Sequence, residues 1–302
     1  MSIAAIIPAR HEAAGTGAGR PGRVSHISAS VAVLLALACC MPGCARLGRA
    51  EVRSAEGEGF RETDFQGRNF LVKGWLKYGS PGDDKTLHVY MEGDGRAWQS
   101  RRVVSADPTP TAALGLRLAR AQPGREPVLY LARPGQYLSA KQLRECDAIY
   151  WTRARFAEEV IVDMNAAVEA AKRAAGAERV ALYGYSGGGA VAVLMAARRL
   201  DVAFLATVAG NLDHEFWTQI HGVTPLSQSL NPIDAAKAVR NIPQAHLAGG
   251  ADKVVPVSVA QRFCEALAGD QVKLMIIPGL GHEDAWDRIW KDVWETFARS
   301  EE

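Results

Sequence analysis

Residues 179–199 decide the fold, and they read Arg-Val-Ala-Leu-Tyr-Gly-Tyr-Ser-Gly-Gly-Gly-Ala-Val-Ala-Val-Leu-Met-Ala-Ala-Arg-Arg. The residues up to Tyr183 have the apolar character of a buried strand, and those from Gly187 have that of a helix. Between them lies Gly-x-Ser-x-Gly, in a strand–turn–helix setting. The glycines permit a sharp turn, which exposes the hydroxyl of Ser186 beside the first N–H groups of the helix. Ser186 is therefore the predicted nucleophile.

A glycine-rich turn before a helix can also bind phosphate. The chain has no Gly-x-x-x-x-Gly-Lys-Ser/Thr loop, and no Gly-x-Gly-x-x-Gly followed by an acidic residue on the next strand. A plain tight turn between strand and helix is the structural alternative. A nucleophile, unlike a plain turn, needs a base and an acid at suitable positions.

A serine nucleophile needs an imidazole base, which in turn needs a carboxylate to orient it. Among the seven histidines, His282 follows the apolar run Val272–Ile277 and precedes the last predicted helix. Asp252 follows the apolar run Gln244–Ala248. His88 and His246 lie inside predicted strands, which favours structural roles. Ser186, Asp252 and His282 thus each follow a separate predicted strand.

Predicted strands and helices alternate from about residue 69. Several strands are continuous apolar runs, typical of strands buried on both faces of a mostly parallel sheet. The predicted strands are Phe70–Tyr78, Thr86–Met91, Val128–Ala132, Arg179–Tyr183, Ala203–Val208, Gln244–Ala248 and Val272–Ile277; the predicted helices are Arg155–Ala174, Gly187–Arg199, Val259–Ala268 and Glu283–Arg299. In the last helix, Trp286, Trp290 and Trp294 recur at helical spacing and are expected to face the core. The pattern predicts an open α/β sheet flanked by helices, with ligands at the carboxyl ends of the strands.

From about residue 70 to the end, the chain resembles the α/β-hydrolase superfamily. The resemblance rests on the Gly-x-Ser-x-Gly turn, on Gly-x-x-Asp-x-x-Val-Pro at 249–256, on Pro-Gly-x-Gly-His at 278–282, and on the order Ser186, Asp252, His282. Asp213 is the second choice for the acid because it follows the strand ending at Val208, whereas Asp284 lies too close to His282.

About thirty residues, 211–242, occupy the place where relatives insert a cap, so we expect no large cap domain. His214, Trp217 and His221 in this segment either face substrate or face one another.

The oxyanion of an acyl-transfer reaction needs two backbone N–H donors. One is expected from Gly187, the residue after the nucleophile. The other is expected from Glu-Gly-Asp-Gly at 92–95, with Asp94 preferred and Gly93 next; Glu92 stands where many relatives have His. A simple turn is the alternative interpretation of these four residues.

The same region resembles a narrower group of exported bacterial hydrolases. The shared segments are Tyr-x-Glu-Gly-Asp-Gly at 90–95, Asp-Pro-Thr-Pro at 107–110, Leu-Ala-Arg-Pro at 131–134 and Leu-Asp-His…Trp-Thr…His at 212–221. In that group a Cys follows Arg-Pro and pairs with a later Cys. Here Gly135 takes its place, so the resemblance implies that Cys146 lacks this partner. Tyr137, Tyr150 and Trp151 flank the polar loop 133–153, where they either line a pocket mouth or pack beneath it.

The N-terminal region has the features of an export signal. Val31–Ala38 is an apolar run that follows three arginines and is too short to span a bilayer. It ends in Leu-Ala-Cys at 37–39, which resembles the bacterial lipoprotein signal and implies lipidation of Cys39. Cys40 and Cys44 fit that pattern less well, and a plain cleaved signal is the alternative. We expect export to the periplasmic face of a bacterial membrane, with a lipid anchor.

Three regions follow: a signal peptide at 1–38, a lipidated tether at 39–62, and an α/β-hydrolase domain at 63–302. Residues 45–62 are rich in Gly, Arg and Glu, as expected of a tether or of a frayed start of the domain. The whole chain has 35 Lys and Arg against 33 Asp and Glu, and the leader removes three Arg and one Glu. The mature chain is then electrically neutral, which argues against nucleic acid as a partner. The composition also excludes collagen-like, coiled-coil and wholly disordered proteins.

These observations predict a serine hydrolase acting on an ester or thioester of a small to medium acyl group, through an acyl-enzyme. No cofactor and no metal are expected. Amide or peptide bonds are the enzymatic alternative. The other alternative is a non-catalytic envelope-binding lipoprotein, because fold alone does not fix function.

Overall fold

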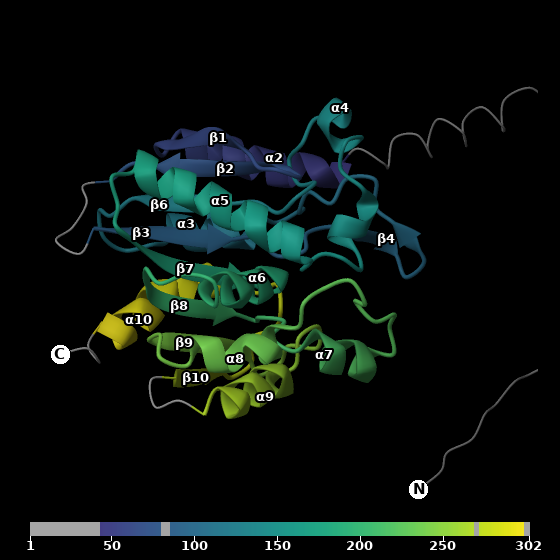
Figure 1. Cartoon of the computed structure of the whole chain (residues 1–302), viewed down its shortest axis with the longest axis vertical. Helices are drawn as coiled ribbons and strands as arrows, with labels where there is room; N and C mark the ends of the chain where they lie inside the picture. The colour runs from purple at the N-terminus through teal and green to yellow at the C-terminus, as the bar shows by residue number, and fades with distance from the viewer. Residues whose placement is uncertain (1–42, 80–84, 269–271, 299–302) are drawn as a thin grey trace, which may run out of the picture. The chain divides into compact units, whose positions relative to one another are not determined.

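The computed structural model describes residues 43–79, 85–268 and 272–298. Its centre is an eight-stranded sheet with the order β1-β2-β6-β3-β7-β8-β9-β10 (Figure 1). Strands β6, β3, β7, β8, β9 and β10 run parallel, whereas β2 pairs antiparallel with both β1 and β6. The bounds are β1 Phe60–Gln66, β2 Leu71–Lys77, β3 Thr86–Met91, β6 Val128–Leu131, β7 Arg179–Tyr185, β8 Val202–Val208, β9 Gln244–Gly249 and β10 Val272–Ile277. The mostly parallel sheet confirms the predicted fold class.

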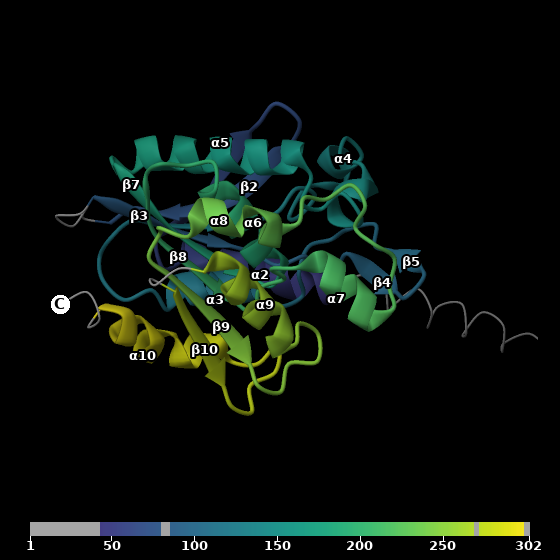
Figure 2. The same ribbon diagram turned by 60° about the horizontal axis from the view of Figure 1, so that its bottom comes forward.

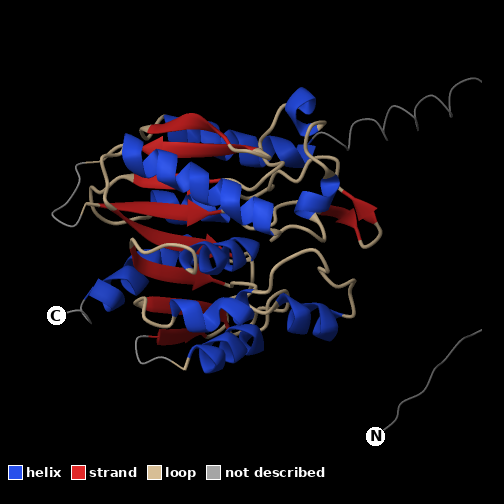
Figure 3. Cartoon of the chain, viewed as in Figure 1, coloured by secondary structure: helices blue, strands red, loops and turns tan. Residues whose placement is uncertain are grey.

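Helices cover both faces of the sheet (Figure 2). One core lies between the sheet and α5 (Glu158–Ala174), α6 (Gly187–Ala196), α8 (Ala236–Val239) and α9 (Val257–Leu267). The other contains residues of α2 (Gly43–Glu56), α3 (Leu114–Arg120) and α10 (Trp286–Ala298). Short elements complete the chain: β4 (Trp98–Ser100), β5 (Val103–Val104), α4 (Ala140–Leu143), η1 (Ala148–Trp151), α7 (His214–His221) and η2 (Pro232–Ala235). Figure 3 shows how strands and helices alternate through the layers.

The apolar runs of the sequence occupy the positions that their composition predicts. Every residue of β3, β6 and β9 is buried, as strands covered on both faces must be. All ten residues of α6 are buried too, because this helix is enclosed on every side. Trp286 and Trp290 of α10 face the core, and Trp294 packs against it.

The two strand histidines are buried as expected. His88 Nδ1 lies 3.0 Å from the hydroxyl of Tyr183, and His246 Nδ1 lies 2.9 Å from that of Thr207. Burial lowers the pKa of His246 to about 3, so this imidazole is neutral.

The predicted tether at 39–62 is wrong from Gly43 onward. Residues Gly43–Glu56 form helix α2, and β1 begins at Phe60, so the ordered domain starts well before residue 63. Arg49 donates to the carbonyl oxygens of Tyr137 and Leu138, while Glu51 binds Arg117 and accepts from the N–H of Ala113. The polar residues that resembled a tether are therefore used in docking α2. Cys39 and Cys40 lie outside the described residues.

The remaining differences concern short elements. The sequence pattern does not indicate strands β1, β4 and β5 or the short helices α3, α4, α7, α8, η1 and η2, because none has a long periodic apolar pattern. Between residues 211 and 242 lie only α7, η2 and α8, which agrees with the absence of a large cap in the described chain. No helix in the described residues has both the length and the apolar character to cross a bilayer.

A buried carboxylate joins α5 to the loop between β1 and β2. Asp163 is only 2% exposed, and it accepts hydrogen bonds from the backbone N–H groups of Arg68, Asn69 and Phe70 at 3.1, 2.6 and 2.8 Å. A Cβ on Gly67 would lie 2.5 Å from this carboxyl group. The loop therefore needs both a carboxylate at 163 and a glycine at 67.

We expect Asp163→Ala to lower the free energy of unfolding by about 2 to 4 kcal/mol, because it leaves three backbone N–H groups without their acceptor. Gly67→Ala should also destabilise the protein by displacing the same carboxylate. Guanidinium unfolding of the full chain measures both. Glu178→Ala, which removes an exposed carboxylate, is the control and should leave the midpoint almost unchanged. An unchanged midpoint for Asp163→Ala would contradict this account.

Candidate active site

Ser186 lies at the turn between β7 and α6 in a conformation that is rare for any residue with a side chain. Its backbone angles are φ 52° and ψ −120°. Three hydrogen bonds hold it there: its N–H donates to the carbonyl of Val208 at 2.9 Å, and its carbonyl accepts from the N–H groups of Gly189 and Asn211, each at 3.0 Å. Such a conformation costs on the order of 1 to 3 kcal/mol and exposes the side chain at the carboxyl edge of the sheet.

The glycines around Ser186 are required by close backbone contacts. A Cβ on Gly184 would lie 2.2 Å from the carbonyl oxygen of Gly188, and one on Gly188 would lie 2.5 Å from that of Met91. The turn can therefore form only if both positions lack a side chain.

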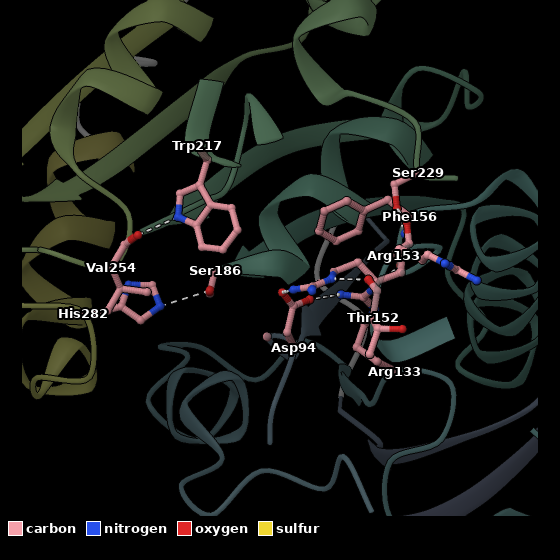
Figure 4. A network of polar contacts seen from close by, with 12 residues as sticks. Asp94, Arg133, Thr152, Arg153, Phe156, Ser186, Trp217, Ser229, Val254 and His282 are labelled. Carbon is pink, nitrogen blue, oxygen red and sulfur yellow. Dashed lines mark hydrogen bonds and ion pairs between the residues drawn. The ribbon is translucent and has the colours of Figure 1, made fainter. Parts of the chain in front are cut away.

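The structure brings together the three side chains that the sequence singled out. His282 Nε2 lies 3.0 Å from Ser186 Oγ (Figure 4), and His282 Nδ1 lies 2.8 Å from Asp252 Oδ2. The other carboxylate oxygen of Asp252 accepts from the N–H groups of Val254 and Val255, each at 2.8 Å. Because a carboxylate only accepts, His282 Nδ1 donates to it and Nε2 remains free to accept the serine proton.

The alternative acids lie elsewhere. Asp213 accepts from the N–H of Phe216 at the start of α7 and from Asn231, and it pairs with Arg262 at 2.9 Å. Asp284 accepts from the N–H of Gly281. In the described structure, neither carboxylate forms a hydrogen bond with His282, whose Nδ1 is bound by Asp252.

The loop 92–95 reaches the nucleophile, and its Asp94 carboxylate lies against Gly187. A Cβ on Gly187 would lie 2.1 Å from Asp94 Oδ1. Two buried guanidinium groups hold this carboxylate, that of Arg155 at 2.5 Å and that of Arg133 at 3.4 Å. Figure 4 shows Arg133 beside Asp94. Arg133 also donates to the backbone carbonyl of Arg155. Asp94 is thus fixed beside the first residue of α6.

Gly93 does not have a free N–H, which corrects its place as the reserve oxyanion donor. Its N–H donates to Glu92 Oε1 at 2.9 Å, and its carbonyl accepts from Gln136 at 2.9 Å. The N–H of Asp94 and that of Gly187 remain as the candidate pair.

Glu92 is the most perturbed acid at this edge of the sheet. Besides Gly93, its carboxylate accepts from the N–H of Gly115 at 3.1 Å and from the hydroxyl of Tyr130 at 2.9 Å. Burial raises the pKa of Glu92 to about 7, although these hydrogen bonds oppose the shift. Sequence reasoning noted Glu92 only as a replacement for His, and it gave no role to Arg133 or Arg155.

A cavity of about 410 Å³ opens above Ser186 and His282. Apolar groups form much of its wall, among them Ala97, Trp98, Pro110, Leu114, Trp217 and Val254. Arg155 and Asn211 add polar groups, and the side-chain oxygen of Asn211 is buried without a hydrogen-bond partner in the described structure. Apolar walls around a few polar groups are typical of sites for small organic molecules.

Of the three aromatic candidates in and near α7, only Trp217 lines the cavity. Its indole N–H donates to the carbonyl of Val254, which His221 also contacts at 2.9 Å. Trp217 and His221 therefore face one another, whereas His214 is buried beside Phe156.

The aromatic residues near loop 133–153 do not form the wall of this cavity. Tyr137 and Trp151 are buried beneath the loop, and Tyr150 lines a separate hollow. Cys146 is a half-buried free thiol in the part of the chain that the structure describes. Within the described residues, no three His, Cys, Asp or Glu side chains are arranged to hold a metal ion.

The raised pKa of Glu92 predicts how stability changes with pH. Between about pH 4.5 and 7 the folded state keeps a proton on Glu92 that the unfolded state releases. The free energy of unfolding should therefore fall across this range, with about 3 kcal/mol arising from Glu92. Guanidinium unfolding at pH 5 and pH 8 measures the change, and Glu92→Gln should show a smaller one. Identical pH dependence in both proteins would contradict this assignment.

The chain is similar to known proteins in sequence and in fold. Three solved structures share the fold: Est1E from Butyrivibrio proteoclasticus (13% identity, 79% of this chain and 98% of that one, TM-score 0.57), an esterase from Pyrococcus furiosus (16%, 80% and 90%, 0.55), and an acylaminoacyl peptidase from Pyrococcus horikoshii (15%, 82% and 43%, 0.59). An uncharacterized protein of Mycobacterium tuberculosis is 30% identical over 111 residues, which span 35% of this chain and only 38% of the relative.

The model of the dienelactone hydrolase family matches residues 134–289, which is just over half of the chain. These residues include Ser186, Asp252 and His282. The fold, the family match and the solved structures agree on an α/β-hydrolase, and the chain belongs to the dienelactone hydrolase family.

Proposed function

We propose that this hydrolase is a serine esterase that cleaves a carboxylic ester or thioester through an acyl-enzyme. The observation that carries the proposal is the chain of contacts from Ser186 Oγ to His282 and on to Asp252, at 3.0 and 2.8 Å. This arrangement has the nucleophile, the base and the orienting carboxylate that acyl transfer requires.

Each group has a defined part in the proposed reaction. Ser186 Oγ attacks the acyl carbonyl while His282 Nε2 takes its proton, and His282 then gives that proton to the leaving oxygen or sulfur. Water, deprotonated by the same imidazole, attacks the acyl-enzyme and releases the acid and Ser186. Asp252 stabilises the imidazolium that forms in each half-reaction.

The backbone N–H groups of Gly187 and Asp94 would stabilise the oxyanion. The Asp94 carboxylate alone would oppose this role, since it places negative charge against Gly187. Arg133 and Arg155 offset that charge and fix the loop, so the two residues act as positioning groups.

Two findings favour an ester over an amide. A dienelactone is itself a cyclic carboxylic ester, and the Pyrococcus furiosus neighbour is named an esterase. The acylaminoacyl peptidase of Pyrococcus horikoshii shares the fold, so amide cleavage is the alternative that the assay must decide. The apolar wall of the cavity suits short to medium acyl groups.

Labelling with a fluorophosphonate tests the nucleophile directly. The full chain should form one covalent adduct, and Ser186→Ala should form none and lose about a thousandfold or more in p-nitrophenyl ester hydrolysis. Ser54→Ala, an exposed serine of α2, is the control and should behave like the parent protein. An adduct that survives Ser186→Ala would sink the proposal, and faster cleavage of a p-nitroanilide than of the matched ester would make the enzyme an amidase.

Replacing one guanidinium group tests the oxyanion loop. Arg155→Met should lower kcat by about tenfold to a hundredfold with a smaller change in KM, because it exposes the developing oxyanion to the Asp94 carboxylate. Arg155→Lys should recover part of kcat. Arg153→Met, which removes an exposed guanidinium two residues away (Figure 4), is the matched control. A rise in KM with unchanged kcat would show instead that Arg155 binds substrate.

A further inference from the structure

Large exposed apolar side chains gather around the mouth of the cavity. Six side chains that are 37% to 50% exposed form what we call the rim surface: Trp98, Val103 and Val104 of the β4–β5 hairpin, Ile220 and Val223 at the end of α7, and Val254. They are six of the eleven large exposed apolar side chains among the described residues. Single exposed apolar residues need no explanation, but a cluster at the mouth of a site indicates a binding surface.

The rim surface lies on both sides of the cavity and is continuous with its wall. Trp98 and Val254 line the cavity themselves, and Ile220 lies nearly one helical turn beyond the cavity-lining Trp217. Figures 1 and 2 both place β4 and α7 at the edge of the sheet where the parallel strands end. A flat apolar layer that covered the rim would therefore cover the mouth above Ser186.

The charges on the hairpin indicate what kind of layer fits. Residues 95–105 contain Arg96, Arg101 and Arg102 and no Asp or Glu. Arg101 and Arg102 are exposed at the hairpin turn, and none of the three arginines forms an ion pair with another described residue. The exposed carboxylates nearest the mouth are outside the hairpin: Glu215 belongs to α7, and Glu283 follows His282. Tryptophan and valine beside unpaired arginine suit the interface of an anionic lipid layer.

The start of the domain lies beside the same wall. Gly48 of α2 packs so closely on Pro110, a cavity-lining residue, that a Cβ would lie 2.0 Å from its carbonyl oxygen. The chain thus enters the described domain next to the cavity.

We propose that the rim surface docks the cavity mouth onto an anionic phospholipid layer, from which apolar esters enter the site. The docking stands on the rim alone, whereas the entry of esters rests on the proposed function. A second copy of this chain or a protein partner is a different occupant, and the experiments below distinguish them.

Hydrogen–deuterium exchange of the full chain, with vesicles of equal parts phosphatidylcholine and phosphatidylglycerol, tests the docking. Amides at 98–104 and 219–224 should exchange at least about threefold more slowly with vesicles. The turn at Leu200, an exposed leucine between α6 and β8 at the opposite edge of the sheet, should not change. This readout works even if the N-terminal leader itself holds the chain on the vesicle. Unchanged exchange at the rim, equal protection at Leu200, or a chain that does not bind the vesicles would overturn the proposal.

Paired variants test the consequence for catalysis. Val103→Ser with Ile220→Ser changes two rim residues outside the cavity wall, and it should slow hydrolysis of an ester dissolved in the vesicles by about tenfold. Its rate on a water-soluble ester should not change, and Leu200→Ser should affect neither rate. Arg101→Gln should weaken vesicle binding about fivefold with phosphatidylglycerol and little without it.

The outcomes separate the two proposals. If no ester were hydrolysed in a Ser186-dependent manner, the proposed function would be refuted. The exchange experiment would still show whether the rim surface docks onto the vesicles. Equal loss of both ester rates in the paired variant would mean that these residues support the fold or the site, against the docking role. A dimer seen by light scattering, lost in the paired variant and unaccompanied by rim protection on vesicles, would assign the surface to self-association instead.

Discussion

The backbone of Ser186 is the constraint on which the rest of the molecule depends. With φ at 52°, the serine is held in the left-handed region by hydrogen bonds to Val208 and Asn211. The turn also requires α6 to approach the end of β3 so closely that Gly188 cannot carry a side chain. Such strain persists only where the surrounding structure over-determines it. Here a helix buried on every side and a sheet of fully buried central strands supply that rigidity.

Buried charge at the carboxyl edge of the sheet is the second constraint. Asp94 lies against Gly187, and an isolated carboxylate there would be costly to bury and unfavourable for an oxyanion. Arg133 and Arg155 offset it, and burial in turn lowers the pKa of Arg133 to about 10. Glu92 begins the same loop, and burial raises the pKa of its carboxyl group to about 7. The loop is thus held at Asp94 by two arginine ion pairs and at Glu92 by the hydrogen bonds of a buried carboxyl group with a raised pKa.

The sequence indicates that Ser186, Asp252 and His282 lie together because each of these side chains is tied to a local pattern. Ser186, Asp252 and His282 each follow an apolar run, and parallel strands bring their carboxyl ends to one edge. Arg155 could not be found in this way, because its partner Asp94 is sixty-one positions away and no periodic pattern links them. Gly93 was a reasonable donor by spacing alone. Only the side-chain conformation of the preceding Glu92 shows that its N–H is engaged.

In two segments, the polarity of the residues differs from what their place in the structure would suggest. Helix α2 is polar enough to resemble a tether, yet Arg49 and Glu51 use that polarity to bind Tyr137, Ala113 and Arg117 of the folded domain. The β4–β5 hairpin is the converse, since Trp98, Val103 and Val104 are apolar and remain exposed. Folding accounts for the first disagreement because the ion pairs are intramolecular. It leaves the second unexplained, because exposed valine and tryptophan contribute little to the stability of an isolated domain. The exposed apolar surface lies at the mouth of the cavity and does not contribute to folding. Its simplest explanation is a binding partner that docks there.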